Sequence, residues 1–365
     1  MKKYLRKHNV TIHTIGPVFI GSGKEISKKE YILDDEKIHV IDQFKLYDYV
    51  KKIGKNKRFD DFLARNWQSD LKSWLENNNV SIDSIKDCYK YEIKHSDTAL
   101  SRGTNITVME FMRDAYGMPY VPGSSIKGML RNIILTYELM KAPNNYIDNR
   151  NDYSRAINKG GKRNFLLKNQ QAMLEAKILN TLERKEERIG DAVNDCFAGI
   201  RVSDAMPQCD EDMVLCQRLE YHIDGTQKNL NVLRECIKPG VDINFSITID
   251  EQLCKYSVED IEHAITTFSN MYDDVFKLKF RNIPASANNT IYLGGGVGFI
   301  SKTDIYPLFG EDALEKTIEI FDKTNVSRQH GHYKDKKLGV SPHILKATKY
   351  QRAIYHMGEC TWEFD

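Results

Sequence analysis

The sequence lacks several features that define common classes of protein. Its hydrophobic stretches are short and broken by charges, and none reaches the roughly 18 apolar residues that a membrane-spanning helix needs. The seven cysteines include no C-x-x-C pair, which disfavours a disulfide framework and a zinc ribbon, so we expect reduced and mostly buried thiols. No apolar core follows the basic residues at the N-terminus. We therefore expect no signal peptide, no membrane partner and a cytoplasmic location.

The pattern of apolar residues predicts a mixed α+β fold. The 365 residues are 41% hydrophobic, enough for one large or two medium domains. Strand patterns combined with helix patterns occur in both halves, so we predict two ferredoxin-like (RRM-like) domains, residues 1–205 and 206–365. Four segments stand out within them: a helical insertion at about 44–86, a mobile insertion at about 141–165, a glycine-rich loop at 294–299 and a mobile, disordered basic segment at about 322–343.

Charge is spread unevenly along the chain. The net charge of +2 does not by itself indicate nucleic acid as a partner. However, residues 1–30 carry seven Lys or Arg against two Asp or Glu, and residues 323–349 carry seven against one. Such segregation builds an electropositive surface if the segments fold together, whereas two solvated tails explain the same counts. Composition leaves both interpretations open.

The strongest local motif is a glycine-rich loop, Leu293-Gly-Gly-Gly-Val-Gly-Phe299, which directly follows a predicted strand. Because glycine has no Cβ, a polynucleotide can approach the backbone, and N–H groups can turn toward one anion. Phe299 adds a ring on which a base can stack. No Gly-Lys-Ser/Thr follows, which excludes a Walker A loop, and a dinucleotide fingerprint would need glycine at position 299. The loop residues that we expect to bind RNA are Gly294, Gly295, Gly296, Gly298 and Phe299.

A second motif, Pro122-Gly-Ser-Ser-Ile-Lys-Gly-Met-Leu-Arg131, opens a predicted helix that runs to about residue 140. Ser124 or Ser125 is placed to cap this helix, and the N-terminus of a helix favours anions. Lys127 and Arg131 are four residues apart, so we expect them to share one face and grip adjacent phosphates. An ordinary serine-capped helix with two surface cations explains the same residues.

A third motif is a short glycine turn that carries a cation after the first predicted strand. It consists of Gly21, Ser22, Gly23 and Lys24. By itself it predicts little more than a turn. Because of its place in the order of the motifs, we expect these four residues to contribute to the same binding site as the other two motifs.

The three motifs lie within an ordered set of five stretches: Pro17–Gly23, Tyr120–Arg131, Ile200–Asp204, Leu233–Gly240 and Leu293–Phe299. Together they resemble the RAMP (repeat-associated mysterious protein) superfamily of CRISPR proteins. More narrowly, their order and spacing resemble the fifth subunit of the type III-A (Csm) interference complex, and the resemblance runs from about residue 8 to the C-terminus. The 141–165 insertion and the basic 323–349 segment have no counterpart in it.

The resemblance implies a non-catalytic RNA-binding subunit with two RRM-like domains. It would bind the 3′ side of the guide RNA (crRNA), contact target RNA, and assemble against neighbouring Csm backbone subunits. It would also assist maturation of the guide 3′ end by recruiting a host exoribonuclease. The glycine-rich loop matches the signature loop of the family, and Ser125, Lys127 and Arg131 fall at its characteristic helix start.

Two other functions remain open from the residues alone. A metal-independent endoribonuclease of the same superfamily would need a general base, for which His13 beside the first glycine turn and Asp97 are weak candidates. His330 and His332 lie in the segment that we expect to be mobile, and two ligands on a loop make a poor metal site. A phosphate-loop enzyme acting on small molecules is the more distant alternative. We expect no catalytic residue, metal or cofactor.

Overall fold

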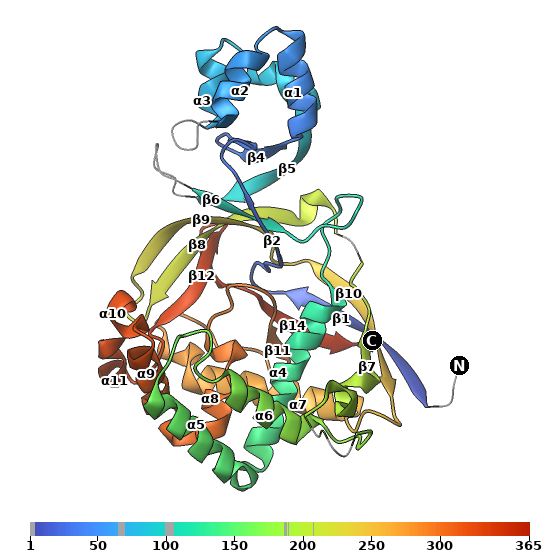
Figure 1. Cartoon of the computed structure of the whole chain (residues 1–365), viewed down its shortest axis with the longest axis vertical. Coiled ribbons are helices and arrows are strands. Elements are labelled where there is room, and N and C mark those ends of the chain that lie inside the picture. The colour runs from blue at the N-terminus through green and yellow to red at the C-terminus, as the bar shows by residue number, and fades with distance from the viewer. Residues whose placement is uncertain (1–3, 65–69, 99–105, 186–187, 189, 207) are drawn as a thin grey trace.

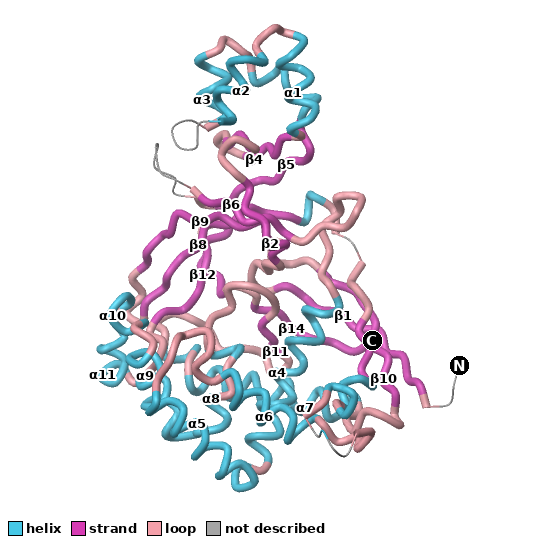
Figure 2. The backbone as a smooth tube through the Cα atoms, viewed as in Figure 1, coloured by secondary structure: helices cyan, strands magenta, loops and turns pink. Residues whose placement is uncertain are grey.

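The computed structural model describes all residues except 1–3, 65–69, 99–105, 186–187, 189 and 207. Its described strands form two curled sheets in the body of the molecule, and most of its helices gather on one side of them (Figure 2). A small helical head projects from the opposite end (Figure 1). The mixed α+β class is therefore confirmed. The ferredoxin-like topology of two domains stays a prediction.

The smaller sheet is antiparallel throughout and is centred on the first strand. Its order is β11-β14-β1-β10-β7. In β1, Val10, Ile12 and Thr14 are buried on one face while residues between them stay partly exposed, which is the alternation that a sheet with one covered face requires. The strands are β1 (Leu5–Thr14), β7 (Ile200–Val202), β10 (Asp242–Asp250), β11 (Thr290–Tyr292) and β14 (Glu359–Phe364).

The larger sheet runs from the body into the head. Its main order is β2-β6-β9-β8-β5-β4-β3, and β12 pairs with β8 and with β13. Its central strand β8 is buried along most of its length because it has partners on both edges. The strands are β2 (Gly21–Ile26), β3 (Tyr31–Leu33), β4 (Lys37–Ile41), β5 (Tyr89–Ser96), β6 (Thr107–Phe111), β8 (Met213–His222), β9 (Gln227–Ile237), β12 (Ile344–Tyr350) and β13 (Ala353–His356).

The head has a hydrophobic core of its own, separate from the core of the body. Phe59 and Trp74 pack edge to face in it, with ring centroids 4.9 Å apart. Its helices are α1 (Gln43–Lys52), α2 (Asn56–Ala64) and α3 (Leu71–Asn77). They occupy the stretch for which the sequence predicted a helical insertion.

Two longer helices, α4 and α7, pack against each other on the helical side of the body (Figure 1). Ser257 and Asp260 form a capping box at the start of α7. The helices of the body are α4 (Gly123–Lys141), α5 (Ile147–Lys159), α6 (Lys168–Leu179), α7 (Val258–Val275), α8 (Ile305–Phe309), α9 (Ala313–Lys323), α10 (Val326–His330) and α11 (Asp335–Leu338). No helix in the described parts of the chain is long and apolar enough to cross a lipid bilayer.

Two expectations about mobile segments differ from the structure. Residues 141–165 contain α5, because Tyr153 and Ile157 are four apart on one helix face and are fully buried. Residues 322–343 contain α10 and α11, because His332, Asp335 and Ser341 are buried and joined by hydrogen bonds. Because both segments are polar in composition, the sequence alone did not reveal these helices.

The boundary near residue 205 stays a prediction. Both sheets take strands from both sides of it, since β1 pairs with β10 and β6 pairs with β9. The cysteines agree with the prediction: all seven are free thiols, and six of them are buried.

Candidate nucleic-acid interface

One cleft of about 390 Å³ brings parts of all three sequence motifs together. Its wall includes Gly21 at the start of β2, Ser124 and Ser125 in the first turn of α4, and Gly294 and Gly295 in the glycine-rich loop. Backbone pairing joins two of these segments, because Phe19 and Gly294 form an isolated bridge and the N–H of Gly295 donates to the carbonyl of Phe19 at 2.7 Å. The fold thus places three motifs that are distant in the sequence around a single cleft.

The glycine-rich loop needs its glycines for reasons of packing as well as conformation. Gly294, Gly296 and Gly298 have positive φ angles of 91°, 87° and 98°. A Cβ on Gly294 would lie 2.3 Å from the carbonyl oxygen of Phe19. Since the N–H of Gly295 is already bonded to that oxygen, it is not free to hold a phosphate. The close packing of this loop against the residues before β2 therefore accounts for part of the glycine motif, whether or not the loop binds RNA.

The start of α4 corrects the expected helix cap. The helix begins at Gly123 after Pro122, and neither serine side chain caps it. Instead, the N–H of Gly123 donates to a carboxylate oxygen of Asp204 at 2.7 Å, because the chain after β7 passes the helix end. The hydroxyls of Ser124 and Ser125 have no hydrogen-bond partner among the described residues, and both serines line the cleft. They are therefore available as donors to a ligand.

Arg234, on β9 directly behind the glycine-rich loop, lies in the stretch Leu233–Gly240 but was not predicted as a binding residue. A Cβ on Gly296 would lie 2.0 Å from its Nη1, so only glycine leaves room for the guanidinium there. The guanidinium also lies over the ring of Phe19, 5.0 Å from the centroid. Its Nε is buried without a hydrogen bond, and Arg234 takes part in none of the ion pairs found among the described residues. Burial, followed by the charge of Arg218, lowers the pKa of Arg234.

Arg234 is one member of a basic cluster with Arg218, Lys302 and Lys346. Lys302 lines the cleft, and partial desolvation together with the charge of Arg234 lowers its pKa. Burial and the charge of Arg218 lower the pKa of Lys346, which has one counterion, Glu220, at 3.3 Å. The buried Nε of Arg218 has no hydrogen-bond partner in the described structure. These neighbouring cations repel one another, so an anion that bound among them would be stabilised.

The two cations predicted on α4 are occupied by contacts within the protein. The Nζ of Lys127 donates to the carbonyls of Phe197 and Ile200, both at 2.7 Å. Arg131 pairs with Glu175 at 2.9 Å and with Asp195 at 2.6 Å. Neither residue lines the cleft. A role in gripping phosphates would require these contacts to break.

The remaining predicted residues lie around the cleft without forming its wall. The hydroxyl of Ser22 donates to Glu110 at 2.9 Å, and Lys24 lies 3.6 Å from Glu30, so this turn is tied to neighbouring carboxylates. Gly23 has a positive φ of 88° and open space around it. Phe299 packs edge to face on Phe321 at 5.4 Å and lines an adjacent hollow instead.

Comparison with known families decides the identity of the fold. A sequence model of the RAMP superfamily matches residues 11–301, which is most of the chain. This chain belongs to the RAMP superfamily. The matched region includes the glycine turn, Arg234 and the glycine-rich loop, and it ends before the segment 322–343.

Similar RAMP proteins carry the name Csm5. CRISPR system Cms protein Csm5 of Mycobacterium tuberculosis is 29% identical, over 99% of this chain and 98% of its own. The protein of the same name from Streptococcus thermophilus is 28% identical, over 83% of this chain and 81% of its own. Similarity to proteins of this name therefore extends along nearly the whole chain.

Two solved structures share the RAMP fold of this chain. A chain in the cryo-EM structure of a Csm–crRNA–target RNA ternary complex in a type III-A CRISPR–Cas system superposes with a TM-score of 0.68 at 18% identity. It covers 98% of this chain and 100% of that one. The crystal structure of T. onnurineus Csm5 superposes with a TM-score of 0.61 at 17% identity, over 96% and 99% of the two chains.

The weak catalytic candidates of this RAMP protein both make structural contacts. His13 is held by Asp242 at 2.6 Å and by Glu363 at 3.1 Å, and the hydrogen bonds to these carboxylates raise its pKa. A histidine stabilised in its protonated form is a poor general base at neutral pH. Asp97 accepts a hydrogen bond from the backbone N–H of Arg352 at 2.7 Å. Neither His13 nor Asp97 lines the cleft.

Proposed function

We propose that this chain is a non-catalytic RNA-binding subunit of a type III-A CRISPR effector complex, and that RNA phosphates occupy the cleft beside the basic cluster. The observation that carries the proposal is Arg234, a largely buried guanidinium with no carboxylate partner among the described residues, behind the glycine-rich loop. A buried cation without a counterion costs free energy unless a ligand supplies the opposite charge. A chain of the same fold occurs in a solved Csm–crRNA–target RNA complex, and this supports RNA as the ligand.

The geometry suits a single-stranded backbone rather than a small molecule. The cleft is lined by the hydroxyls of Ser124 and Ser125 and by the cation of Lys302. Hydroxyls and cations are the groups that bind phosphates without reading a base. The glycine-rich loop keeps side chains out of the path, so a polymer can run along the surface.

The proposed partners of this chain are inferred from a solved complex that contains a chain of the same fold. That assembly contains Csm proteins, crRNA and target RNA. We infer that this chain binds the 3′ side of the crRNA in the cytoplasm and contacts neighbouring Csm subunits. We infer further that it assists crRNA maturation with a host exoribonuclease. The two ferredoxin-like domains, residues 1–205 and 206–365, belong to the same proposal.

The test measures binding and integrity of a labelled single-stranded RNA with the purified full chain. We expect the wild type to bind the RNA and leave it intact. Replacement of Arg234 by Gln should weaken binding about tenfold to a hundredfold, since a hydrogen bond to a charged group contributes about 1.5–3 kcal/mol. The same replacement should not lower the free energy of unfolding, because it removes a buried charge that lacks a partner.

Lys57→Ala is the matched control, since Lys57 is an exposed cation on α2 in the head. It should leave the RNA affinity unchanged. Wild-type affinity in the Arg234→Gln variant would contradict the proposed RNA path. Shortening of the RNA that is lost in His13→Ala or Asp97→Ala would instead establish the endoribonuclease alternative.

A further inference from the structure

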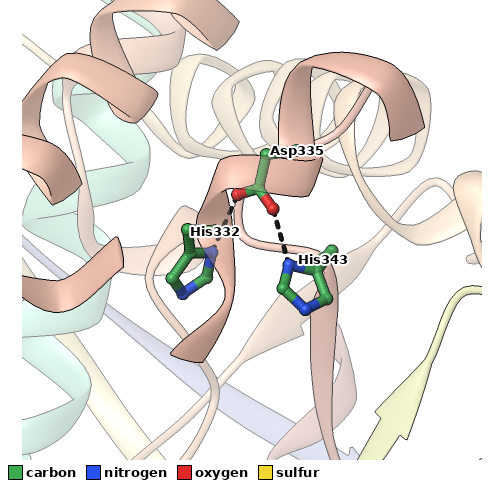
Figure 3. Close-up of side chains that lie close together, drawn as sticks. All are labelled: His332, Asp335 and His343. Atoms are coloured by element: carbon green, nitrogen blue, oxygen red, sulfur yellow. Dashed lines mark hydrogen bonds and ion pairs between the residues drawn. The ribbon is translucent and has the colours of Figure 1, made fainter. Parts of the chain in front are cut away.

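Three buried polar side chains meet beside the start of β12, well apart in sequence from the motifs of the cleft. His332, Asp335 and His343 lie with both imidazole Nδ1 atoms facing one carboxylate (Figure 3). The Nδ1 of His332 is 2.8 Å from one oxygen of Asp335, and the Nδ1 of His343 is 2.5 Å from the other. The hydroxyl of Ser341 donates to Asp335 at 2.5 Å.

The burial of this group is unusual for a carboxylate. The side chain of Asp335 is fully buried, and His332 and His343 are 4% and 8% exposed. A fully buried carboxyl group that two imidazoles face is an arrangement that metal sites use.

Further imidazoles surround the three residues. The ring of His222 lies 6.0 Å from that of His343, and the ring of His330 lies 6.1 Å from that of His332.

We propose that His332, Asp335 and His343 form a binding site for a divalent transition-metal ion of the zinc type. Each residue offers one ligand atom, and these atoms lie within 4.8 Å of one another. Two imidazoles and one carboxylate suit zinc, whereas magnesium and calcium prefer oxygen ligands alone. Binding of the ion would replace the present hydrogen bonds between the imidazoles and the carboxylate, because a histidine binds a metal through an unprotonated ring nitrogen.

Binding of the ion would require the three ligand atoms to move apart from their present hydrogen-bonded distances. Zinc binds nitrogen and oxygen at about 2.0–2.2 Å, so ligand atoms around a tetrahedral ion lie about 3.3 Å apart. The two imidazoles must therefore each move away from Asp335 by roughly half an ångström or slightly more. Rotation of the three side chains about their own bonds supplies a movement of this size. The fourth coordination position remains for a non-protein ligand.

Such an ion would add a cross-link between three parts of this segment. His332 belongs to a short turn of 3₁₀ helix, Asp335 to α11, and His343 directly precedes β12. β12 pairs with β8 and carries Lys346 of the basic cluster. Metal binding should therefore stabilise the folded chain by mass action and hold this edge of the larger sheet in place.

The test uses the full chain, purified without a histidine tag and freed of metal with a chelator. Zinc titration should show one tight site per chain. A hundredfold excess of zinc over its dissociation constant should raise the melting temperature by a few degrees. Cobalt should bind at the same site and give the visible absorption of a tetrahedral ion, which zinc then removes. Absence of one saturable site in the wild-type protein would overturn the proposal without any variant.

Variants identify the ligands. Asp335→Asn and His343→Gln should each weaken zinc binding at least tenfold, and circular dichroism establishes whether these proteins are folded. His263→Ala is the control, because His263 lies exposed on α7. Equal loss of binding in His263→Ala, or undiminished binding in folded Asp335→Asn and His343→Gln, would refute this ligand set. RNA is absent from these measurements, so they test the metal site independently of the proposed RNA site.

Discussion

At the scale of single residues, the interior of the larger sheet contains a carboxyl group with an unusual environment. Glu235 on β9 is completely buried, accepts a hydrogen bond from the hydroxyl of Tyr91 at 2.8 Å, and accepts another from the N–H of Phe111 at 2.9 Å. Arg113 lies 4.0 Å away. Burial outweighs the opposing effects of Arg113 and the hydrogen bonds, and it raises the pKa of Glu235 to about 7.

This raised pKa predicts a pH dependence of stability. In the unfolded chain Glu235 ionises near its ordinary value of 4.5, while in the folded chain it keeps its proton to about pH 7. Between these values the folded state binds the extra proton, so the free energy of unfolding falls as the pH rises. Because a difference of one in pKa corresponds to about 1.4 kcal/mol, Glu235→Gln should gain up to about 3 kcal/mol relative to wild type between pH 5 and pH 8.

Urea denaturation of the wild type and Glu235→Gln at both pH values measures this difference. Glu262→Gln serves as the control, since Glu262 is exposed on α7, and its difference from wild type should stay constant. A constant difference for Glu235→Gln as well would show that Glu235 is ionised in the fold at pH 5.

The candidate site shows which residues a sequence can reveal. Gly21, Ser124 and Gly294 stand in local patterns with a known use in turns and helix starts, and all three line the cleft. Arg234 is a single cation in a strand, and nothing local shows that it lacks a carboxylate. That property depends on neighbours supplied by other strands and loops. For the same reason, the sequence could not show that the Nζ of Lys127 is hydrogen-bonded to the carbonyls of Phe197 and Ile200. These residues approach Lys127 only in the folded chain.

At the scale of elements, α5 shows how a polar segment can be part of the core. Its neighbours α6 and α9 cover the face that carries Tyr153 and Ile157. The hydroxyl of Tyr153 donates to Asp304, whose other carboxylate oxygen is buried without a hydrogen bond. Two buried apolar positions were too few to outweigh the Asn, Lys and Arg residues in the sequence pattern, whereas the more strongly periodic helices of the head were predictable.

The contact between Tyr153 and Asp304 predicts a specific loss of stability. Tyr153→Phe keeps the ring and removes only the donor, so the buried carboxyl of Asp304 loses a partner. We expect the free energy of unfolding to fall by about 1–3 kcal/mol, measured by chemical denaturation. Tyr116→Phe removes the same atom from a residue that is 93% exposed, and it should have no measurable effect. An equally small effect at Tyr153 would mean that α5 is detached from the body in solution, as the sequence pattern suggested.

At the scale of the whole molecule, the sheets depend on pairings that no local pattern specifies. β1 pairs with β10 and with β14 at the far end of the chain, and β12 inserts beside β5 on the edge of β8. The sequence indicated most of the strands and the α+β class. It did not indicate their order, because partner choice between distant strands is decided by the packing of the complete fold.

The distribution of charge over the whole molecule leads to the last prediction. With 53 basic and 51 acidic residues, the chain has a net charge of only +2, so long-range attraction to RNA is weak. Binding must then come from local contacts at the basic cluster. Each phosphate contact with a single strand contributes about 0.7 to the slope of log K against log salt, so two to four contacts give a slope of about −1.4 to −2.8.

Lys302→Ala should reduce this slope by about 0.7, because it removes one cation that lines the cleft. Lys127→Ala should leave the slope at the wild-type value, because the Nζ of Lys127 donates hydrogen bonds to two backbone carbonyls and the residue does not line the cleft. Lys57→Ala in the head should do the same. The slopes follow from binding isotherms measured across a range of salt concentrations. If the Lys127 variant changed the slope and the Lys302 variant did not, RNA would follow the predicted face of α4 rather than the cleft. If all three variants changed it equally, RNA would bind over a diffuse surface, and the lack of a counterion for Arg234 among the described residues would need another explanation.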